Sequence, residues 1–140
     1  MIKNFKKINM PNFEIDNLDH VAIRVTDLTR SANWYQNTLG LKKYRLEKWG
    51  DFPIFLLAGK SGIALFPEKE NNVTPQKSDI DHFAFKVTNE NFQKAKAEFD
   101  QKGIKYIFKD HFYFHSLYLQ DPDNHTVELT TLIVDEKEFY

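Results

Sequence analysis

The sequence predicts an α+β protein built from two copies of one βαβββ module. The segment LDHVAIRVT at residues 18–26 recurs as IDHFAFKVT at residues 80–88, with Asp, His, Ala, Val and Thr at matching places. Each copy is followed by one helix-like stretch and three strand-like runs that turn residues separate. With 140 residues, of which 41% are hydrophobic, the chain can form one domain whose two halves share a core.

The first module is expected over residues 17–67. After its first strand, apolar residues recur at helical spacing within residues 27–40, namely Leu28, Ala32, Tyr35 and Leu39. Asp27 or Thr29 can cap this helix, and Gly40 can end it. Three strands are then predicted at residues 41–49, 52–58 and 62–66, with glycine-containing turns between them.

The second module, expected over residues 80–134, repeats this plan. Its helix is predicted at residues 89–103, where Phe92, Ala95 and Phe99 form the apolar face and Gly103 ends the helix. Its strands are predicted at residues 104–108, 112–119 and 125–134, the last two joined by an Asp-Pro-Asp-Asn turn. An N-terminal extension (1–16), a polar linker (68–79) and a C-terminal tail (135–140) complete the predicted organisation.

The composition excludes several function classes. The formal net charge of −1 gives no reason to expect nucleic acid or an anionic membrane as partner. Because the chain has no cysteine, it can form no disulfide and no thiolate nucleophile, and any metal would be held by histidine and carboxylate. No apolar run is long enough to span a membrane, and residues 1–16 do not resemble a signal peptide, so a cytoplasmic location is expected.

Two histidines, His20 and His82, occupy matching places near the start of the repeated strands. Each could be a structural residue inherited by duplication, hydrogen-bonded and inert. If a pseudo-twofold axis relates the modules, however, the two side chains can converge near that axis. The pair is therefore a candidate for shared chemistry.

A carboxylate that could join the histidines is Glu128, which stands between Val127 and Leu129 in the last predicted strand. Either this side chain faces solvent on an edge strand, or it faces the interior, where an ionised carboxylate is costly unless paired or bound to metal. Two imidazoles and one carboxylate would make a three-ligand site with open positions for water or substrate. Fe, Mn, Zn and Ni all suit such donors.

The stretches LDHVAIRVTDLTRSANWYQNTLGL and HSLYLQDPDNHTVELTT resemble the vicinal oxygen chelate superfamily over residues 17–133. This superfamily includes glyoxalase I, extradiol dioxygenases, fosfomycin thiol transferases and bleomycin-binding proteins. The resemblance implies that the paired modules curl into an eight-stranded cup around one divalent metal, with His20, His82 and Glu128 as ligands. It also implies a homodimer, with each cup built from one chain or from modules of two chains.

The resemblance to two of these subfamilies is incomplete. Glyoxalase I has a fourth ligand, a glutamate in the first module, but the offset that matches His20 to His82 places Phe66 opposite Glu128. Fosfomycin transferases need a basic pocket for a phosphonate, and this chain offers few arginines: Arg24, Arg30 and Arg45. Arg24 would share a strand face with His20, or would extend as a solvated side chain at the strand end.

The extradiol dioxygenases share the run from His111 through Tyr118 to Glu128, and the resemblance implies that His111 and Tyr118 help to move substrate protons. Asn124 stands where that family usually has glycine. Strict alternation would place His111 and His115 on the strand face opposite Tyr118, so a histidine could share the cup with Tyr118 only across a bulge. His111 and His115 are also compatible with ordinary sheet or loop roles, and His125, in the turn, is expected to be solvated.

Aromatic residues make up 15% of the chain and could line a cup for an apolar or ring-bearing ligand, or could simply form the core. Phe83 and Phe85 alternate away from His82 and are expected under a helix. The other candidates for the cup are Phe112, Tyr113, Phe114, Trp34 and Trp49. Two function classes remain: a metalloenzyme of the glyoxalase, dioxygenase or thiol transferase type acting on a small molecule, and a metal-free binding module of the bleomycin-resistance type.

Overall fold

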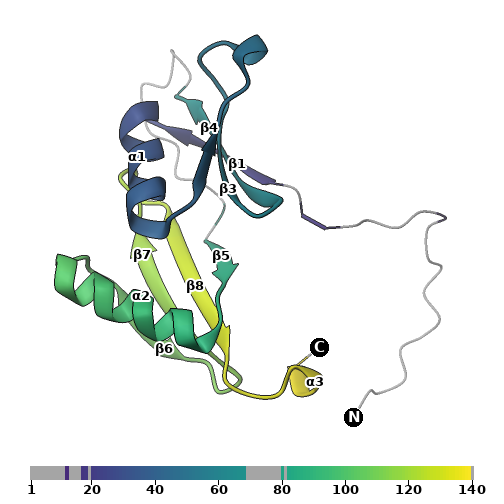
Figure 1. Ribbon diagram of the computed structural model, residues 1–140, viewed down its shortest axis with the longest axis vertical. Coiled ribbons are helices and arrows are strands. Elements are labelled where there is room, and N and C mark those ends of the chain that lie inside the picture. Colours follow the sequence, from purple (N-terminus) through teal and green to yellow (C-terminus); the bar gives the residue numbers. More distant parts are fainter. Residues whose placement is uncertain (1–11, 13–16, 19, 69–79, 81, 140) are drawn as a thin grey trace.

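The computed structural model describes residues 12, 17–18, 20–68, 80 and 82–139, and these confirm the α+β fold with two βαβββ modules (Figure 1). The described strands form two four-stranded sheets, with strand orders β1-β4-β3-β2 (sheet A) and β5-β8-β7-β6 (sheet B). The predicted N-terminal extension and linker fall almost wholly outside the described residues. No described helix has the length and apolar character needed to cross a membrane.

The first module consists of β1 (His20–Val25), α1 (Leu28–Leu39), β2 (Lys42–Tyr44), β3 (Ile54–Ala58) and β4 (Ser61–Pro67). Asp27 caps α1 by accepting a hydrogen bond from the Arg30 amide, and Gly40 ends the helix in the left-handed conformation. The strand predicted at residues 41–49 is wrong in its second half. Glu47–Trp49 instead form a 3₁₀ turn, closed by the Gly50 amide donating to the Glu47 carbonyl at 3.1 Å.

The second module consists of β5 (Phe83–Lys86), α2 (Asn89–Lys102), β6 (Ile107–Asp110), β7 (Phe114–Gln120) and β8 (Thr126–Leu132), followed by α3 (Glu136–Phe139). Thr88 caps α2, and Gly103 ends it with a φ of 68°. The strand predicted at residues 104–108 begins three residues later. Its first residues complete the helix end, since the Ile104 amide donates to the Phe99 carbonyl at 2.9 Å.

The sheet topology places the last strand of each module in the interior of its sheet. β1 runs parallel to β4, and β5 runs parallel to β8, whereas the hairpins β3–β4 and β7–β8 are antiparallel. Because β8 has a neighbour on both sides, Glu128 cannot be an edge-strand residue. Its relative exposure is 5%, so the interior alternative holds.

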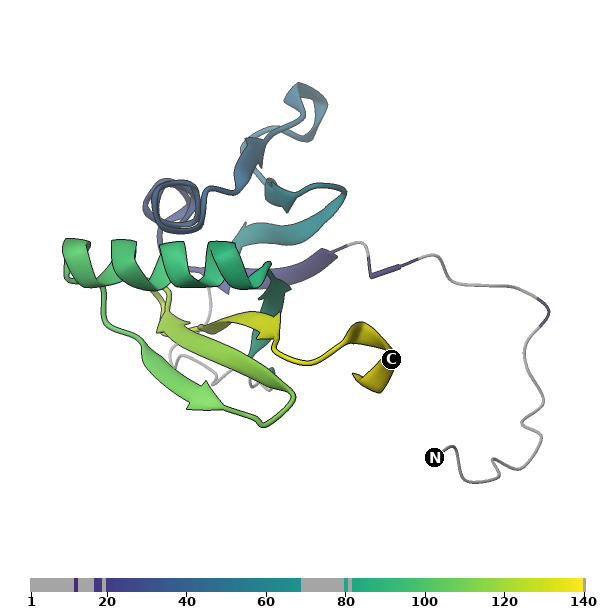
Figure 2. The same ribbon diagram turned by 60° about the horizontal axis from the view of Figure 1, so that its bottom comes forward.

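The modules pack against each other through their helices and the sheet faces beneath them. Figures 1 and 2 show α1 and α2 next to each other, and Figure 2 looks along α1 and across α2. Trp34 and Leu39 of α1 contact the core clusters of both modules. Phe83 and Phe85 pack against the first of these clusters, as their alternation predicted. The opposite faces of the sheets carry the candidate site residues and are not part of these core clusters.

A buried polar cluster also joins α1 to the β7–β8 turn. The Tyr35 hydroxyl donates to Asp121 at 2.8 Å, and His125 Nδ1 lies 2.8 Å from the same carboxylate oxygen. Burial alone would raise the pKa of Asp121, but hydrogen bonds from His125 and Tyr35 outweigh it and hold that pKa below its usual value. The hydrogen bond to Asp121 in turn raises the pKa of His125. His125, with a side chain only 15% exposed, is therefore part of the module interface rather than a solvated turn residue.

Candidate metal centre

Two of the three predicted metal ligands lie together on sheet B. His82 Nε2 is 3.2 Å from Glu128 Oε2, and both residues line a pocket of about 380 Å³. Tyr118, His111, Phe114 and Lys86 are among the other lining residues. The pocket thus combines imidazole, carboxylate and phenol groups on one sheet face.

Strand alternation explains how these groups meet. Glu128 of β8 pairs with Tyr118 of β7 on one side and with Ala84 of β5 on the other. Side chains of paired residues project from the same face of a sheet, and His82 is two residues before Ala84. The small side chain of Ala84 leaves room for the His82 ring beside the carboxylate.

The Glu128 carboxylate accepts a hydrogen bond from Ser116, a residue that the sequence pattern did not identify as a candidate. Ser116 Oγ donates to Glu128 Oε1 at 2.5 Å, and Ser116 is fully buried. Ser116 is two residues before Tyr118 and so projects from the same face of β7. Alternation from Tyr118 was the signal that could have identified it.

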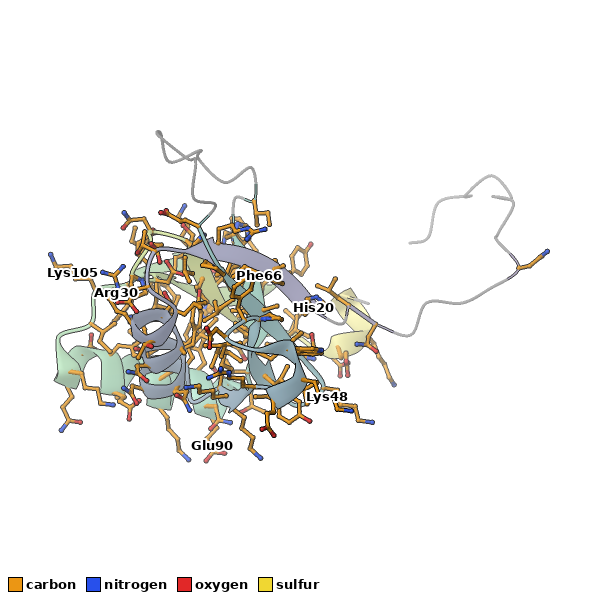
Figure 3. All side chains as sticks on the ribbon, turned by 90° about the horizontal axis from the view of Figure 1, so that it is seen from above. His20, Arg30, Lys48, Phe66, Glu90 and Lys105 are labelled. Atoms are coloured by element: carbon orange, nitrogen blue, oxygen red, sulfur yellow. The ribbon has the colours of Figure 1, made fainter. Side chains whose placement is uncertain are left out.

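The third predicted ligand, His20, lies on the other sheet. Figure 3 shows His20 at the start of β1. Arg30, in the first turn of α1, lies beyond the opposite end of that strand. The His20 ring meets Phe55 edge to face, with 5.2 Å between centroids. Among the described residues, no group of three histidine or carboxylate side chains is close enough to hold a metal. A single chain therefore brings His82 and Glu128 together but does not add His20.

The sheet registers identify the first-module counterpart of Glu128. Ala22 pairs with Ala64 in sheet A as Ala84 pairs with Glu128 in sheet B. The counterpart is therefore Ala64, and the expectation of Phe66 is wrong. The second module has one more residue than the first between its first strand and the end of its helix, and one more in the β7–β8 turn than in the β3–β4 turn. Alanine supplies no ligand either, so the first module has no fourth glutamate at this place.

His111 and Tyr118 meet in the pocket, with His111 Nε2 2.9 Å from the Tyr118 hydroxyl. The connection is a turn rather than the bulge that strict alternation required. His111 lies between β6 and β7, and Phe112 follows with a φ of 69°, its amide donating to Asp110 at 2.9 Å. His115 faces the other way and packs against Phe108, with 5.1 Å between ring centroids.

The remaining candidates are distributed over both sheets. Arg24 donates to the Pro67 carbonyl at 3.0 Å and lies over the Phe66 ring, away from the His82 pocket. Of the aromatic candidates only Phe114 lines this pocket, whereas Trp34 packs in the core and Trp49 lies beside Phe55.

The donor atoms of the pocket fit a divalent metal ion. Imidazole nitrogen and carboxylate oxygen are the usual ligands of Zn, Mn, Fe and Ni in a chain without cysteine. Glu128 has a side chain only 6% exposed, and its carboxylate points at the His82 imidazole rather than at solvent. A carboxylate in such a place is stabilised when a cation binds to it.

Two βαβββ modules, one presenting His20 and the other presenting His82 beside Glu128, define a protein of the vicinal oxygen chelate class. The chain belongs to the Glyoxalase/Bleomycin resistance protein/Dioxygenase superfamily, whose family model matches residues 17–129.

Curated relatives of this chain include transferases. It is 30% identical over 116 residues to the glutathione transferase FosA of Serratia marcescens, covering 82% of this chain and 80% of the relative. It is 31% identical over 134 residues to the metallothiol transferase FosB of a Staphylococcus epidermidis strain, covering 91% of this chain and 90% of the relative. The name metallothiol transferase states that FosB uses a metal and a thiol.

Solved structures share the fold. An integron cassette protein, HFX_CASS4, from the mobile metagenome of the Halifax Harbour sewage outfall has a TM-score of 0.67 at 29% identity, covering 84% of this chain and 100% of that chain. The fosfomycin resistance protein FosX of Mesorhizobium loti has a TM-score of 0.65 at 22% identity, covering 89% and 99%. At that lower identity the FosX likeness concerns the fold alone.

Proposed function

We propose that this chain is a metal-dependent transferase that joins a thiol to a small electrophilic substrate. The observation that carries the proposal is the His82–Glu128 pair, 3.2 Å apart in a pocket of about 380 Å³, a volume suited to a small molecule. Two curated relatives named as a glutathione transferase and a metallothiol transferase favour thiol transfer over the other reactions of the superfamily.

The proposed metal site has three protein ligands: His82 and Glu128 of one chain and His20 of a second copy. In a twofold dimer each copy contributes the same surface, so two equal sites would form. Two exposed aromatic side chains of the module that contains His20 support this arrangement: Trp49 packs on Phe55, which contacts His20, and Phe52 packs on Phe66. Trp49 and Phe52 are each 44% exposed, and burying them against a second copy would favour association.

A divalent ion at these ligands would act as a Lewis acid on a substrate oxygen. His111 Nε2 lies 2.9 Å from the Tyr118 hydroxyl oxygen. In the tautomer in which Nε2 donates to that oxygen, the Tyr118 hydroxyl can donate a hydrogen bond to an oxyanion, and His111 can replace a proton that Tyr118 gives up. Phe114 and Leu132 line the same pocket and would exclude water from the reacting atoms. In the proposed reaction the thiolate sulfur forms a bond to carbon, the carbon–oxygen bond breaks, and the oxygen takes up a proton.

Mixing two inactive variants tests the site across two chains. His20→Ala and Glu128→Ala should each bind no metal and show no activity alone. After joint unfolding and refolding, half of the dimers are mixed and each has one intact site, so about a quarter of the wild-type metal content and activity should return. If all three ligands came from one chain, every site in the mixture would lack a ligand, and metal content and activity would not return. Absence of any recovery in a mixture of folded dimers would therefore contradict the proposal.

The reaction is tested by mass spectrometry with fosfomycin as the electrophile and with glutathione or cysteine as the thiol. We expect a metal-dependent adduct with the wild-type chain and none with His82→Ala. A protein that binds the metal but forms no adduct would contradict thiol transfer and leave the metal site standing. If neither metal binding nor turnover is found, a metal-free binding module replaces the enzyme.

An extradiol dioxygenase is the second candidate, and the His111–Tyr118 hydrogen bond favours it. Such a pair can remove and return the protons of a catechol beside a two-histidine, one-carboxylate iron. Oxygen uptake by the Fe²⁺-loaded chain with catechols, with no adduct in the thiol assay, would favour this activity instead.

A further inference from the structure

We propose that Ser116 is a positioning residue that directs one oxygen of Glu128 to the metal. This inference rests on the metal site proposed above and concerns how that site is held. Nothing in the pattern of histidines and carboxylate requires a serine here, and the evidence for its role is the geometry around Glu128.

The two oxygens of the Glu128 carboxylate have different partners. Ser116 Oγ donates to Oε1 at 2.5 Å, whereas Oε2 lies 3.2 Å from His82 Nε2. The oxygen beside the second ligand is therefore Oε2. A hydrogen bond to Oε1 fixes the rotation of the carboxylate and leaves Oε2 as the oxygen presented to a cation.

Burial makes this arrangement hard to exchange for another. Ser116 has a relative exposure of 0% and Glu128 of 5%, so water cannot easily replace the serine hydroxyl. Turning the carboxylate away would leave a buried hydroxyl and a buried oxygen without this bond, which is unfavourable because neither group gains a hydrogen bond to water in exchange. The carboxylate is thus held in place before the metal binds, which reduces the ordering that binding requires.

The first module provides an internal comparison. At the place of Glu128 it has Ala64, which pairs with Phe55 as Glu128 pairs with Tyr118. Two residues before Phe55 stands Pro53, which has no hydroxyl, whereas two residues before Tyr118 stands Ser116. The serine therefore occurs in the module that has a carboxylate to orient.

A second buried serine offers a matched control. Ser31 is also fully buried and its hydroxyl lies 3.3 Å from a carboxylate oxygen of Asp123, remote from the pocket in the sheet. Ser31→Ala removes the same group from a comparable environment. It measures the general effect of losing such a bond on the folded protein.

The test is titration of the full chain with Mn²⁺ alone, with free Mn²⁺ followed by its electron paramagnetic resonance signal. Ser116→Ala should raise the Kd for Mn²⁺ by about 10–100-fold, as is typical for residues that orient metal ligands. Ser31→Ala should leave the Kd within about twofold of wild type, since Ser31 orients no ligand. Urea unfolding of each variant establishes that it is folded at the titration temperature.

Ser116→Thr keeps the hydroxyl and should restore most of the affinity lost in Ser116→Ala. Equal Kd values for wild type and Ser116→Ala would overturn the positioning role while leaving the metal site intact. An equal loss of Mn²⁺ affinity in Ser116→Ala and Ser31→Ala would also overturn the positioning role, because loss of any buried serine hydroxyl would then have the same effect. If wild type itself shows no saturable Mn²⁺ binding, the proposed site fails and this inference fails with it.

Discussion

The two modules share one backbone plan but present different chemistry on the sheet faces that point away from the helices. In sheet B this face has His82, Tyr118 and Glu128, whereas the corresponding places in sheet A have His20, Phe55 and Ala64. Sheet A therefore offers one imidazole among aromatic side chains, and sheet B offers the carboxylate and the phenol. The two sheets thus repeat one backbone plan with different side chains at the corresponding places.

The different side chains on the two sheets show how a fold with two similar modules can form one asymmetric site. Packing needs only that both modules retain their apolar faces toward the helices, where Phe83, Phe85 and the α1 residues lie. The face that points away from the helices is under no such requirement, because its residues belong to neither core cluster. It can diverge without loss of the fold.

The largest expected effect comes from removing the carboxylate that distinguishes the two modules. Glu128→Gln should weaken metal binding by more than about 100-fold, because even groups that only orient a ligand can cost that much. Glutamine keeps the size of the side chain and can still accept from Ser116, so the fold should persist. Metal content after dialysis measures the effect, and full retention of metal would contradict the assignment of Glu128.

The next prediction concerns a place where sheet A has no room for a side chain. A Cβ built on Gly62 would meet the carbonyl oxygen of Leu56, whereas the corresponding place in sheet B is occupied by Thr126. Gly62→Ala should therefore destabilise the fold by about 3 kcal/mol through overpacking. Urea unfolding should show a much smaller loss for Thr126→Ala, and equal losses would refute the difference between the sheets.

Changing Tyr118 makes sheet B resemble sheet A at one position, since Phe55 is its counterpart. Tyr118→Phe removes the hydroxyl that His111 contacts at 2.9 Å. We expect turnover to fall by about 100-fold, typical of losing a proton-transfer group, with little change in metal affinity. Normal turnover in this variant would exclude Tyr118 from the chemistry.

The smallest expected effect is the pH dependence of the contact between the modules. The lowered pKa of Asp121 stabilises the fold above the unfolded value of about 3.8, and this contribution is lost as pH falls through the lowered pKa. The raised pKa of His125 stabilises the fold below the unfolded value of about 6.5, and this contribution is lost as pH rises through the raised pKa. The contact is therefore strongest between about pH 4 and 6.5.

His125→Asn should flatten the upper side of this profile. We expect wild type to lose about 1 kcal/mol of stability between pH 6 and 8.5, and the variant to lose less, because asparagine does not titrate. The other ionisable groups near His125 are Asp121, Asp123 and Tyr35. Urea unfolding at the two pH values measures the effect. If His125→Asn lost as much stability between these pH values as wild type, the pH dependence would come from groups other than His125.

Local sequence patterns predicted much of the fold. Asp27 and Gly40 bounded α1 closely and Gly103 ended α2, since these signals act within a few residues. Local signals were weaker for the short strands: the run at residues 41–49 contains β-forming residues, yet only Lys42–Tyr44 pair with β3. Pairing depends on a partner strand, which a local pattern does not contain.

Some features of the candidate site could also be predicted from the sequence, and others could not. The repeat and the apolar neighbours of Glu128 were enough to select His20, His82 and Glu128 as candidates. They could not show that Ser116 holds the carboxylate or that His111 reaches Tyr118 through the turn at Phe112. Both contacts join residues on different strands or across a turn whose backbone conformation is not evident from the residue types.

The sequence by itself determined the two-module plan, the helix ends and the residue types available for a metal, because periodicity, capping and composition are local properties. Only the tertiary structure decided that Ala64 is the counterpart of Glu128 and that His82, rather than His20, lies beside it. The physical reason is that strand register and the packing of modules are set by contacts between distant segments. These contacts form together when the chain folds, so no short stretch of sequence specifies them.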